Sequence, residues 1–212
     1  MITINSKNNT YYHCDYIHKE IPAPVPKRYK VNVPLRDGEL DVTSYLSSNV
    51  FYETRQVIIG LELRGLRTDW PSYISTLMND IHGKEVTYSF DEDPGWQWHG
   101  YASVTSIEDH GASCGIQLTI ATDPFKKKTT ETLAVNTTIS GDQNFTLTIT
   151  DPRSYLRFET GAADFTVTYD SQTWTLPSGS STAYGLFLTA GTHTLAVHGA
   201  GTLKIYTTGG SL

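Results

Sequence analysis

Apolar residues alternate with threonines along several stretches of the C-terminal half, and this alternation restricts that half to short β-strands. Neighbouring residues of a strand point to opposite faces of a sheet, so the apolar residues would share one face and the threonines the other. The apolar positions are Phe145, Leu147, Ile149, Phe165, Val167, Tyr169, Leu195, Val197, Leu203 and Ile205. Clusters of Gly and Ser separate these stretches. We expect a small antiparallel β-sandwich whose threonines lie on solvated outer faces.

One stretch of the N-terminal half has the apolar spacing of a helix. Pro71 suits a first helical turn, and Gly83 suits the left-handed residue that ends a helix. The apolar positions between them are Ile74, Leu77, Met78 and Ile81. Because they fall on one face at helical spacing, we expect a helix that packs on a sheet.

Strands are expected on both sides of this helix. The run 57–63 is apolar enough for a strand that is partly buried on both faces. Turn signals separate three further expected strands, as in a meander, and these strands are 85–90, 97–107 and 115–122. The segment 126–130 is polar and has no apolar period, and 20 of the 30 threonines lie from residue 129 onward. We therefore expect two domains, 1–128 and 129–212.

A proline at every second position makes Ile21–Pro26 unusual. Proline removes backbone donors and holds the chain extended, so this segment can be neither a helix nor a central strand. We expect an arm or an edge crossing, with a peptide-recognition motif as the alternative.

Composition excludes several classes of protein. With 38% hydrophobic residues the 212-residue chain can bury a core, which excludes a mainly disordered protein. The net charge of -6 argues against sequence-specific or phosphate-neutralising binding of nucleic acid. No apolar run approaches the roughly 20 residues of a membrane span, so we expect no membrane insertion. Cys14 and Cys114 form no CxxC motif, which excludes a disulfide scaffold and favours synthesis in a reducing compartment.

No motif in the sequence has the full pattern of a catalytic or metal-binding site. Gly111–Gly115 matches the G-x-S-x-G pattern around Ser113, but it lies between two expected strands, where a nucleophile elbow needs a helix next. No histidines have the spacing of metal ligands, and Asp91–Asp93 lacks the glycine and glutamate of an EF-hand, so we expect a solvated loop there. The carboxylates of a glycosidase could be brought together only by the fold, and nothing in the sequence singles out a pair. We expect neither enzymatic activity nor a cofactor or metal.

Three stretches taken in order carry a resemblance to a known family. Arg36–Thr43 reads RDGELDVT, Ile81–Lys84 leads from the expected helix through Val86–Phe90 into an acidic turn, and Asp123–Lys126 follows the meander. This series resembles the N-terminal domain of the distal tail (Dit) proteins of long-tailed, siphovirus-type bacteriophages and prophages. The resemblance covers roughly residues 30–126.

The remaining parts match this family by pattern. Phe187–Leu195 resembles the run that closes a galectin-like sandwich in the family, whereas residues 1–29 match only loosely. Phe125 stands where the family usually has Tyr, and Trp96 and Trp98 stand where Tyr is commoner.

The resemblance implies an architecture and a set of partners. It implies an N-terminal β-sandwich with one α-helix and a long β-hairpin, followed by a galectin-like antiparallel β-sandwich. Six copies would form a ring at the distal end of the virion tail, as the hub of the baseplate, after synthesis in the bacterial cytoplasm. The ring would join the tail tube protein to the tail tip or tail-associated lysin protein. The C-terminal domain would dock a receptor-binding protein or touch host polysaccharide.

Two groups of aromatic residues are candidate sites. Unpaired strand edges and the hairpin 85–107 are expected to carry the ring contact, with Trp96, Trp98, Tyr88 and Phe90 as candidates and ordinary sheet packing as the alternative. Trp174 and Tyr184 could stack on a sugar if they were exposed, whereas burial of Trp174 in the core is the alternative. A carbohydrate-binding module that acts in recognition of the host cell wall is therefore the alternative function.

Overall fold

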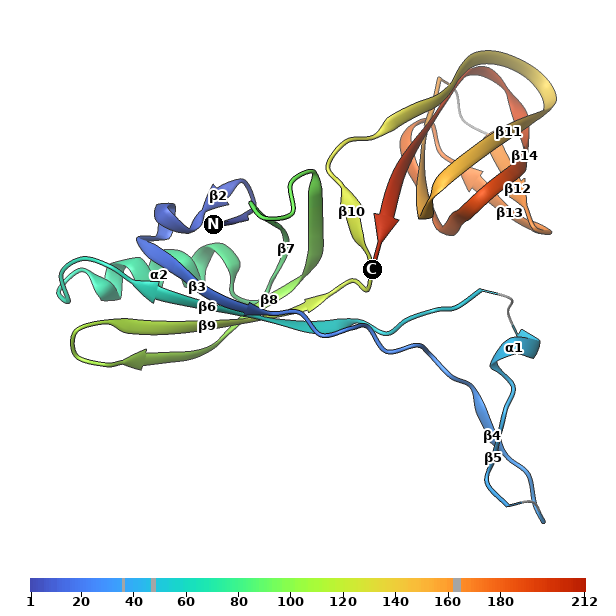
Figure 1. Cartoon of the computed structure of the whole chain (residues 1–212). Helices are drawn as coiled ribbons and strands as arrows, with labels where there is room; N and C mark the ends of the chain where they lie inside the picture. The colour runs from blue at the N-terminus through green and yellow to red at the C-terminus, as the bar shows by residue number, and fades with distance from the viewer. Residues whose placement is uncertain (36, 47–48, 162–164) are drawn as a thin grey trace. The chain divides into compact units, whose positions relative to one another are not determined.

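Antiparallel strands make up most of the chain in the computed structural model, which describes residues 1–35, 37–46, 49–161 and 165–212 (Figure 1). The chain divides into two compact units, which are residues 1–126 with Leu212 (unit 1) and residues 127–211 (unit 2). The mainly β fold that the alternation predicts is confirmed. The predicted domains, 1–128 and 129–212, are parts that are expected to fold independently of each other, and this independence stays a prediction.

Unit 1 is built on one antiparallel sheet. Its strands pair in the order β3–β6–β9–β8–β7–β1–β2, so the meander expected over residues 85–122 is present as β7, β8 and β9. The elements are β1 (Ile2–Ile4), β2 (Lys7–Asn8), η1 (Asn9–Tyr12), β3 (Cys14–Glu20), β6 (Arg55–Leu63), α2 (Trp70–Ile81), β7 (Lys84–Phe90), β8 (Trp96–Asp109) and β9 (Cys114–Thr122). The strand β10 (Lys126–Lys128) follows at the junction of the two units.

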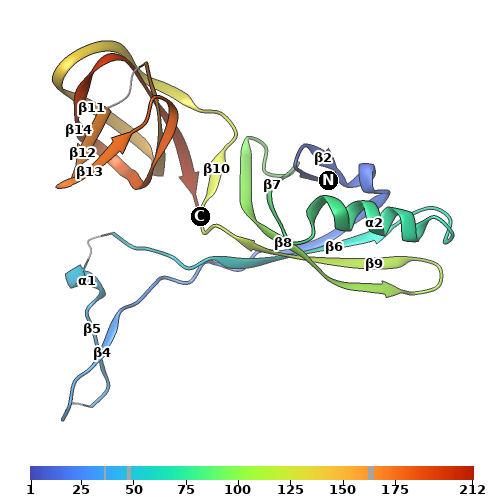
Figure 2. The same ribbon diagram turned by 180° about the vertical axis from the view of Figure 1, so that it is seen from behind.

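The helix α2 covers one face of this sheet. It lies along β6 and β9 in both views (Figures 1 and 2), and its residues Leu77 and Ile81 are buried against the sheet core. Its bounds confirm the helix that the apolar spacing predicts, and Gly83 follows it with a φ of +70°. On β6, Val57, Ile59, Leu61 and Leu63 are buried on the side of this core. The alternate residues of β6 therefore form the opposite face of the sheet.

Residues 22–35, 37–46 and 49–54 form an excursion from this sheet, which we call the arm. Its strands β4 (Lys30–Asn32) and β5 (Glu39–Asp41) form a two-stranded hairpin, and α1 (Thr43–Leu46) adds one helical turn that the sequence pattern did not indicate. Nearer the sheet, a bridge pairs Pro26 with Tyr52. Gly38 has a positive φ of +75°, which suits the turn of this hairpin, whereas Arg36 of the family-like signature lies outside the described residues.

Unit 2 is a β-sandwich in which two long strands, β11 and β14, pair with each other and two short strands, β12 and β13, form a second pair. The strands are β11 (Thr132–Thr160), β12 (Phe165–Tyr169), β13 (Gln172–Leu176) and β14 (Gly179–Ser211), and β11 pairs with β14 along most of its length. The apolar residues of the alternating stretches lie in its core as expected, including Leu147, Val167, Leu195 and Ile205. Phe145 and Tyr169 are only partly buried against that core.

Candidate functional site

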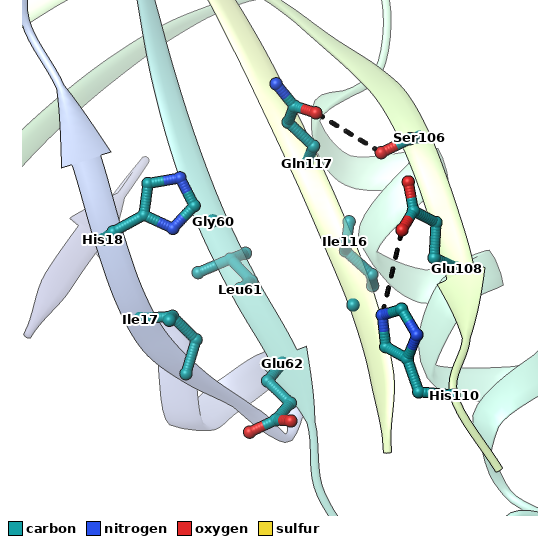
Figure 3. A pocket seen from close by; sticks show the side chains of 11 residues that line it. Ile17, His18, Gly60, Leu61, Glu62, Ser106, Glu108, His110, Ile116 and Gln117 are labelled. Atoms are coloured by element: carbon teal, nitrogen blue, oxygen red, sulfur yellow. Dashed lines mark hydrogen bonds and ion pairs between the residues drawn. The ribbon is translucent and has the colours of Figure 1, made fainter.

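A groove lies on the face of the unit 1 sheet that α2 does not cover (Figure 3). It has a volume of about 330 Å³, and strands β3, β6, β8 and β9 all contribute to its walls. His18 and Glu62 face it from β3 and β6, while Glu108 and His110 face it from the end of β8 and the turn that follows. Ile17 adds an apolar side chain that is 55% exposed.

Two glycines make room for the imidazole rings of the groove. A Cβ on Gly60 would lie 2.3 Å from the ring of His18, and a Cβ on Gly115 would lie 3.3 Å from Nε2 of His110. Both glycines are in strands, where a missing side chain allows close approach to the backbone. The two rings therefore lie close to the sheet, and this position depends on the absence of side chains beneath them.

The polar groups of the groove are unevenly paired. Glu108 lies 3.8 Å from Nε2 of His110, and Ser106 donates a hydrogen bond to Gln117 Oε1 at 3.4 Å. Glu62 is half-buried and has no cationic partner among the described residues. Within residues 1–35, 37–46, 49–161 and 165–212, no three His, Cys, Asp or Glu side chains are placed to hold a metal ion.

Ser113 lies where the sequence pattern predicts, in the turn between β8 and β9. The amide of His110 donates a hydrogen bond to the carbonyl of Ser113 at 2.9 Å, as in a hairpin turn. The segment continues directly into the strand β9, so the geometry of a nucleophile elbow, which requires a following helix, is not formed.

Neither helix in the described part of the chain has the length and apolar character that crossing a bilayer requires.

The acidic turn after β7 is largely exposed, as the sequence suggested for a solvated loop, and its carboxylates form ion pairs. The Asp93 carboxylate lies 2.6 Å from Nζ of Lys126, and Glu92 is paired with Lys19. Asp91 lies 3.8 Å from the N-terminal amine. Each carboxylate faces a cation from a different part of unit 1, so the turn fastens the N-terminus and β3 to the hairpin.

Three of the four aromatic candidates for a ring contact lie inside unit 1. Tyr88, Phe90 and Trp98 are 1%, 3% and 5% exposed, and the rings of Tyr88 and Trp98 are stacked with centroids 6.4 Å apart. Burial raises the pKa of Tyr88. Trp96 is only partly buried, and Nζ of Lys126 lies 5.0 Å from its ring centroid. Trp96 is therefore the candidate that another chain can reach directly.

Arg55 holds the base of the arm, and no sequence motif indicated this role. Its guanidinium donates hydrogen bonds to the carbonyls of Pro22 at 3.1 Å and Pro124 at 2.9 Å, and it lies 4.4 Å from the ring centroid of Trp98. The residue is 7% exposed, and burial lowers its pKa. Because Arg55 begins β6 and Pro22 begins the arm, this side chain joins the two ends of the arm where they leave the sheet.

The two candidates for sugar contact are neighbours in unit 2. The indole N–H of Trp174 donates a hydrogen bond to the carbonyl of Tyr184 at 2.9 Å. Trp174 is partly buried against the core of unit 2, whereas the side chain of Tyr184 is 90% exposed. The pair therefore offers one exposed ring beside a half-buried one.

An ion-pair network around Arg157 also lacked a signal in the sequence. The guanidinium of Arg157 donates to Glu131 at 2.6 and 2.9 Å and to Glu159 at 2.7 Å, and it lies 4.0 Å from the ring centroid of Tyr206. These carboxylates raise the pKa of Arg157, and the guanidinium holds the pKa of Glu159 below its usual range. Such bidentate geometry connects the start of β11 to its end and to β14.

Proteins of known structure resemble this chain in fold. No family model matches the chain, and no curated protein matches its sequence. The crystal structure of Dit from phage SPP1, presented as a paradigm of the hub adsorption apparatus in phages that infect Gram-positive bacteria, is similar with a TM-score of 0.63 and 12% identity. The similarity covers 100% of this chain and 98% of that chain.

Two structures of the baseplate of phage p2 in its activated conformation, with Sr and with Ca, are more distantly similar, each with a TM-score of 0.48. The identities are 8% and 6%, and the similarity covers 98% and 95% of this chain and 97% and 92% of the matched chains. From end to end, the chain thus has the fold of the Dit hub protein of phage SPP1.

Proposed function

We propose that this chain is a structural protein of a phage or prophage tail, the distal tail protein at the hub of the baseplate. The observation that carries this proposal is the similarity to SPP1 Dit, which covers both units and nearly the whole of the matched chain. The family-like stretches 81–94 and 123–126 support it independently, because they lie on α2, β7 and the end of the unit 1 sheet. The role is one of assembly, and no substrate is transformed.

The proposed assembly is a ring of six copies. In it, unit 1 forms the ring between the tail tube protein and the tail tip or tail-associated lysin protein. Unit 2, for which the resemblance implies a galectin-like sandwich, docks a receptor-binding protein. The strand edges of the unit 1 sheet and the hairpin β7–β8 with Trp96 are the proposed contact elements.

Light scattering coupled to size exclusion tests the ring directly. We expect a mass six times that of the 23.5 kDa chain. Because a ring can require its neighbours in the virion, a second measurement uses intact tails, in which labelled antibody against this chain should mark the distal end by electron microscopy. Labelling along the tail or on the capsid, together with a monomeric mass, would contradict the proposal.

The ring would also carry a large negative charge. Six copies with a net charge of -6 each amount to a formal charge of -36. An acidic lumen would repel the phosphate backbone and let DNA pass without adhesion. Tight binding of DNA to the assembled ring at moderate salt would overturn this part of the proposal.

The exposed ring of Tyr184 supports a second candidate, binding of host cell-wall polysaccharide by unit 2. Aromatic rings stack on apolar sugar faces, and Tyr184 is 90% exposed beside the indole of Trp174. Titration with cell-wall polysaccharide should then show binding that Tyr184→Ala weakens and that Tyr101→Ala, an exposed tyrosine of unit 1, leaves unchanged. Equal binding by both variants would exclude this site.

A further inference from the structure

A cavity lies on the outer face of one sheet of unit 2, and we call it the unit 2 cavity. It has a volume of about 290 Å³, and Glu159, Ser180, Thr202 and Lys204 contribute to its walls. In the strand register, Glu159 of β11 pairs with Ser180 on one side and with Lys204 on the other, and both partners belong to β14. The adjacent Phe158 is 0% exposed, so Glu159 and its partners point away from the core.

Hydrogen bonds and ion pairs hold the polar side chains of the unit 2 cavity in place. The carboxylate of Glu159 accepts a hydrogen bond from Arg157 at 2.7 Å and one from Lys204 at 3.3 Å. The hydroxyl of Tyr206 donates to the same carboxylate at 3.2 Å, and Arg157 donates to Oγ of Ser180 at 3.0 Å. Because partners within the chain already fix these groups, a ligand would not have to order them, which lowers the entropic cost of binding.

The same groups keep donors and acceptors for a ligand. The ammonium of Lys204 has three hydrogens and contacts only Glu159 among the described residues. The hydroxyl of Ser180 accepts from Arg157, so its own proton is left to donate. The hydroxyl of the exposed Thr202 both donates and accepts. Hydroxyl groups of a ligand, which also donate and accept, would match this set.

The charges around the unit 2 cavity are balanced. Arg157 and Lys204 supply two positive charges, and Glu131 and Glu159 supply two negative charges. An anionic ligand would meet both carboxylates and a cationic ligand would meet both cations, so neither would gain a net attraction. The ligand that fits this balance is uncharged and rich in hydroxyl groups.

Tyr184 lies on the same outer face as the cavity, further along β14. Positions 180, 182 and 184 alternate with inward positions, of which Ala183 is 5% exposed. Tyr184 follows Ser180 by four residues, which corresponds to roughly 13 Å at about 3.3 Å per residue. The hydrogen bond from the indole of Trp174 holds the backbone at Tyr184. An aromatic platform and a polar cavity therefore lie on one face, at a spacing that a short oligosaccharide can span and a single sugar cannot.

We propose that this face of unit 2 binds a short stretch of an uncharged polysaccharide, with one sugar ring stacked on Tyr184 and the hydroxyls of another sugar in the cavity beside Glu159 and Lys204. The proposal rests on the second candidate function above, to which it adds the class of ligand and a polar subsite. The hub role does not depend on it. The ring of Tyr184 supplies apolar contact, and the cavity fixes the direction of the sugar chain through hydrogen bonds.

Isothermal titration calorimetry with the full-length chain tests this site. The probe is a set of short fragments of the cell-wall polysaccharide of the host strain, freed of phosphate. Thr202→Val and Lys204→Ala should each weaken binding about tenfold, because each removes a polar partner of a ligand hydroxyl. Thr146→Val makes the same change as Thr202→Val at an exposed threonine outside the cavity, so it should leave binding unchanged. Thermal unfolding should show every variant folded at the temperature of the titration.

The outcomes separate this subsite from the other proposals. Binding that Tyr184→Ala weakens but that Thr202→Val and Lys204→Ala leave unchanged would overturn the subsite and leave the second candidate function intact. Binding by phosphate-bearing fragments alone would overturn the uncharged class of ligand. A complete lack of binding would exclude this site together with the second candidate function, whereas the hub role would still be decided by oligomer mass and labelled tails.

The length of the ligand provides a second measurement. A methyl glycoside of a single sugar can occupy either the ring of Tyr184 or the cavity, so it should bind at least about tenfold more weakly than a fragment that reaches both. Equal affinities for the single sugar and the fragments would overturn the two-part site.

Discussion

The hydroxyl of Tyr88 donates a hydrogen bond to Oγ1 of Thr122 across 2.8 Å inside unit 1, where Tyr88 is 1% and Thr122 is 0% exposed. The direction follows from the Thr122 hydroxyl, which itself donates to the carbonyl of Ile120 at 3.1 Å and so has only lone pairs left for Tyr88. This bond ties β7 to the end of β9. Tyr88 is therefore a core residue, and any effect on subunit contact would act through the position of the hairpin.

Tyr88→Phe should lower the free energy of unfolding by about 1 kcal/mol, because it removes one buried donor and leaves an acceptor on Thr122 unpaired. Urea denaturation followed by tryptophan fluorescence measures this loss. The oligomer mass should not change at protein concentrations where the variant is folded. A changed mass with unchanged stability would contradict the assignment of Tyr88 to the core.

Trp96→Ala and Trp98→Ala separate a surface role from a core role within one strand. Trp98 is buried beneath the guanidinium of Arg55, so its truncation should cost about 3–5 kcal/mol of stability. Trp96 is partly exposed, so its truncation should cost much less stability but should weaken the native oligomer. Denaturation and light scattering on the same samples give both readouts, and an intact oligomer in Trp96→Ala would remove the hairpin from the ring contact.

Gly100→Ala and Gly60→Ala form a matched pair of glycines on neighbouring parts of the sheet. A Cβ on Gly100 would lie 2.4 Å from the carbonyl oxygen of Ala121, which is backbone and cannot move away, so we expect a loss of roughly 1–3 kcal/mol or more. A Cβ on Gly60 would meet only the His18 ring, which is exposed and can rotate. Gly60→Ala should therefore be nearly neutral in thermal unfolding, and equal losses for both variants would contradict this contrast.

Alkaline pH should destabilise unit 1. Burial raises the pKa of the Cys14 thiol from 9.0 to about 12 and that of the Tyr12 hydroxyl from 10.0 to about 12. Between these values the unfolded chain has lost protons that the folded chain keeps, so stability is complete below about pH 9 and falls as the pH rises toward 12. Denaturation at pH 7, 9 and 10.5 measures the slope, and Cys14→Ala should make it shallower; an unchanged slope in that variant would assign it to other groups.

Arg157→Lys should destabilise unit 2 by about 1 kcal/mol, because lysine cannot reproduce the fork of bonds to Glu131 together with the contact to Glu159. The partly exposed position of these side chains keeps the effect modest. Lys204→Ala, which removes only a 3.3 Å contact to Glu159, serves as the control and should cost less. Thermal unfolding of both variants measures the difference, and a larger loss for Lys204→Ala would contradict the central place of Arg157.

Local sequence patterns were sufficient for α2 and for the alternating strands of unit 2, but they did not indicate α1 or the hairpin β4–β5. The alternation around Leu147, Val167 and Leu195 predicted which residues unit 2 buries, and the stripe with Leu77 and Ile81 predicted α2, because burial of one face imposes the period of the element itself. The same reasoning could not decide between surface and core for Tyr88 and Trp98. That choice depends on which strands pair across them.

The sequence by itself therefore determined the mainly β class, the position of the helix and the place where the alternating threonines begin. Only the tertiary structure decided that Glu62 lies opposite Gly115, that His18 lies over Gly60, and that Arg55 bonds to Pro22 and Pro124. These residues are separated by tens of positions and share no local period. Their contacts arise from strand register and chain closure, which no single segment encodes.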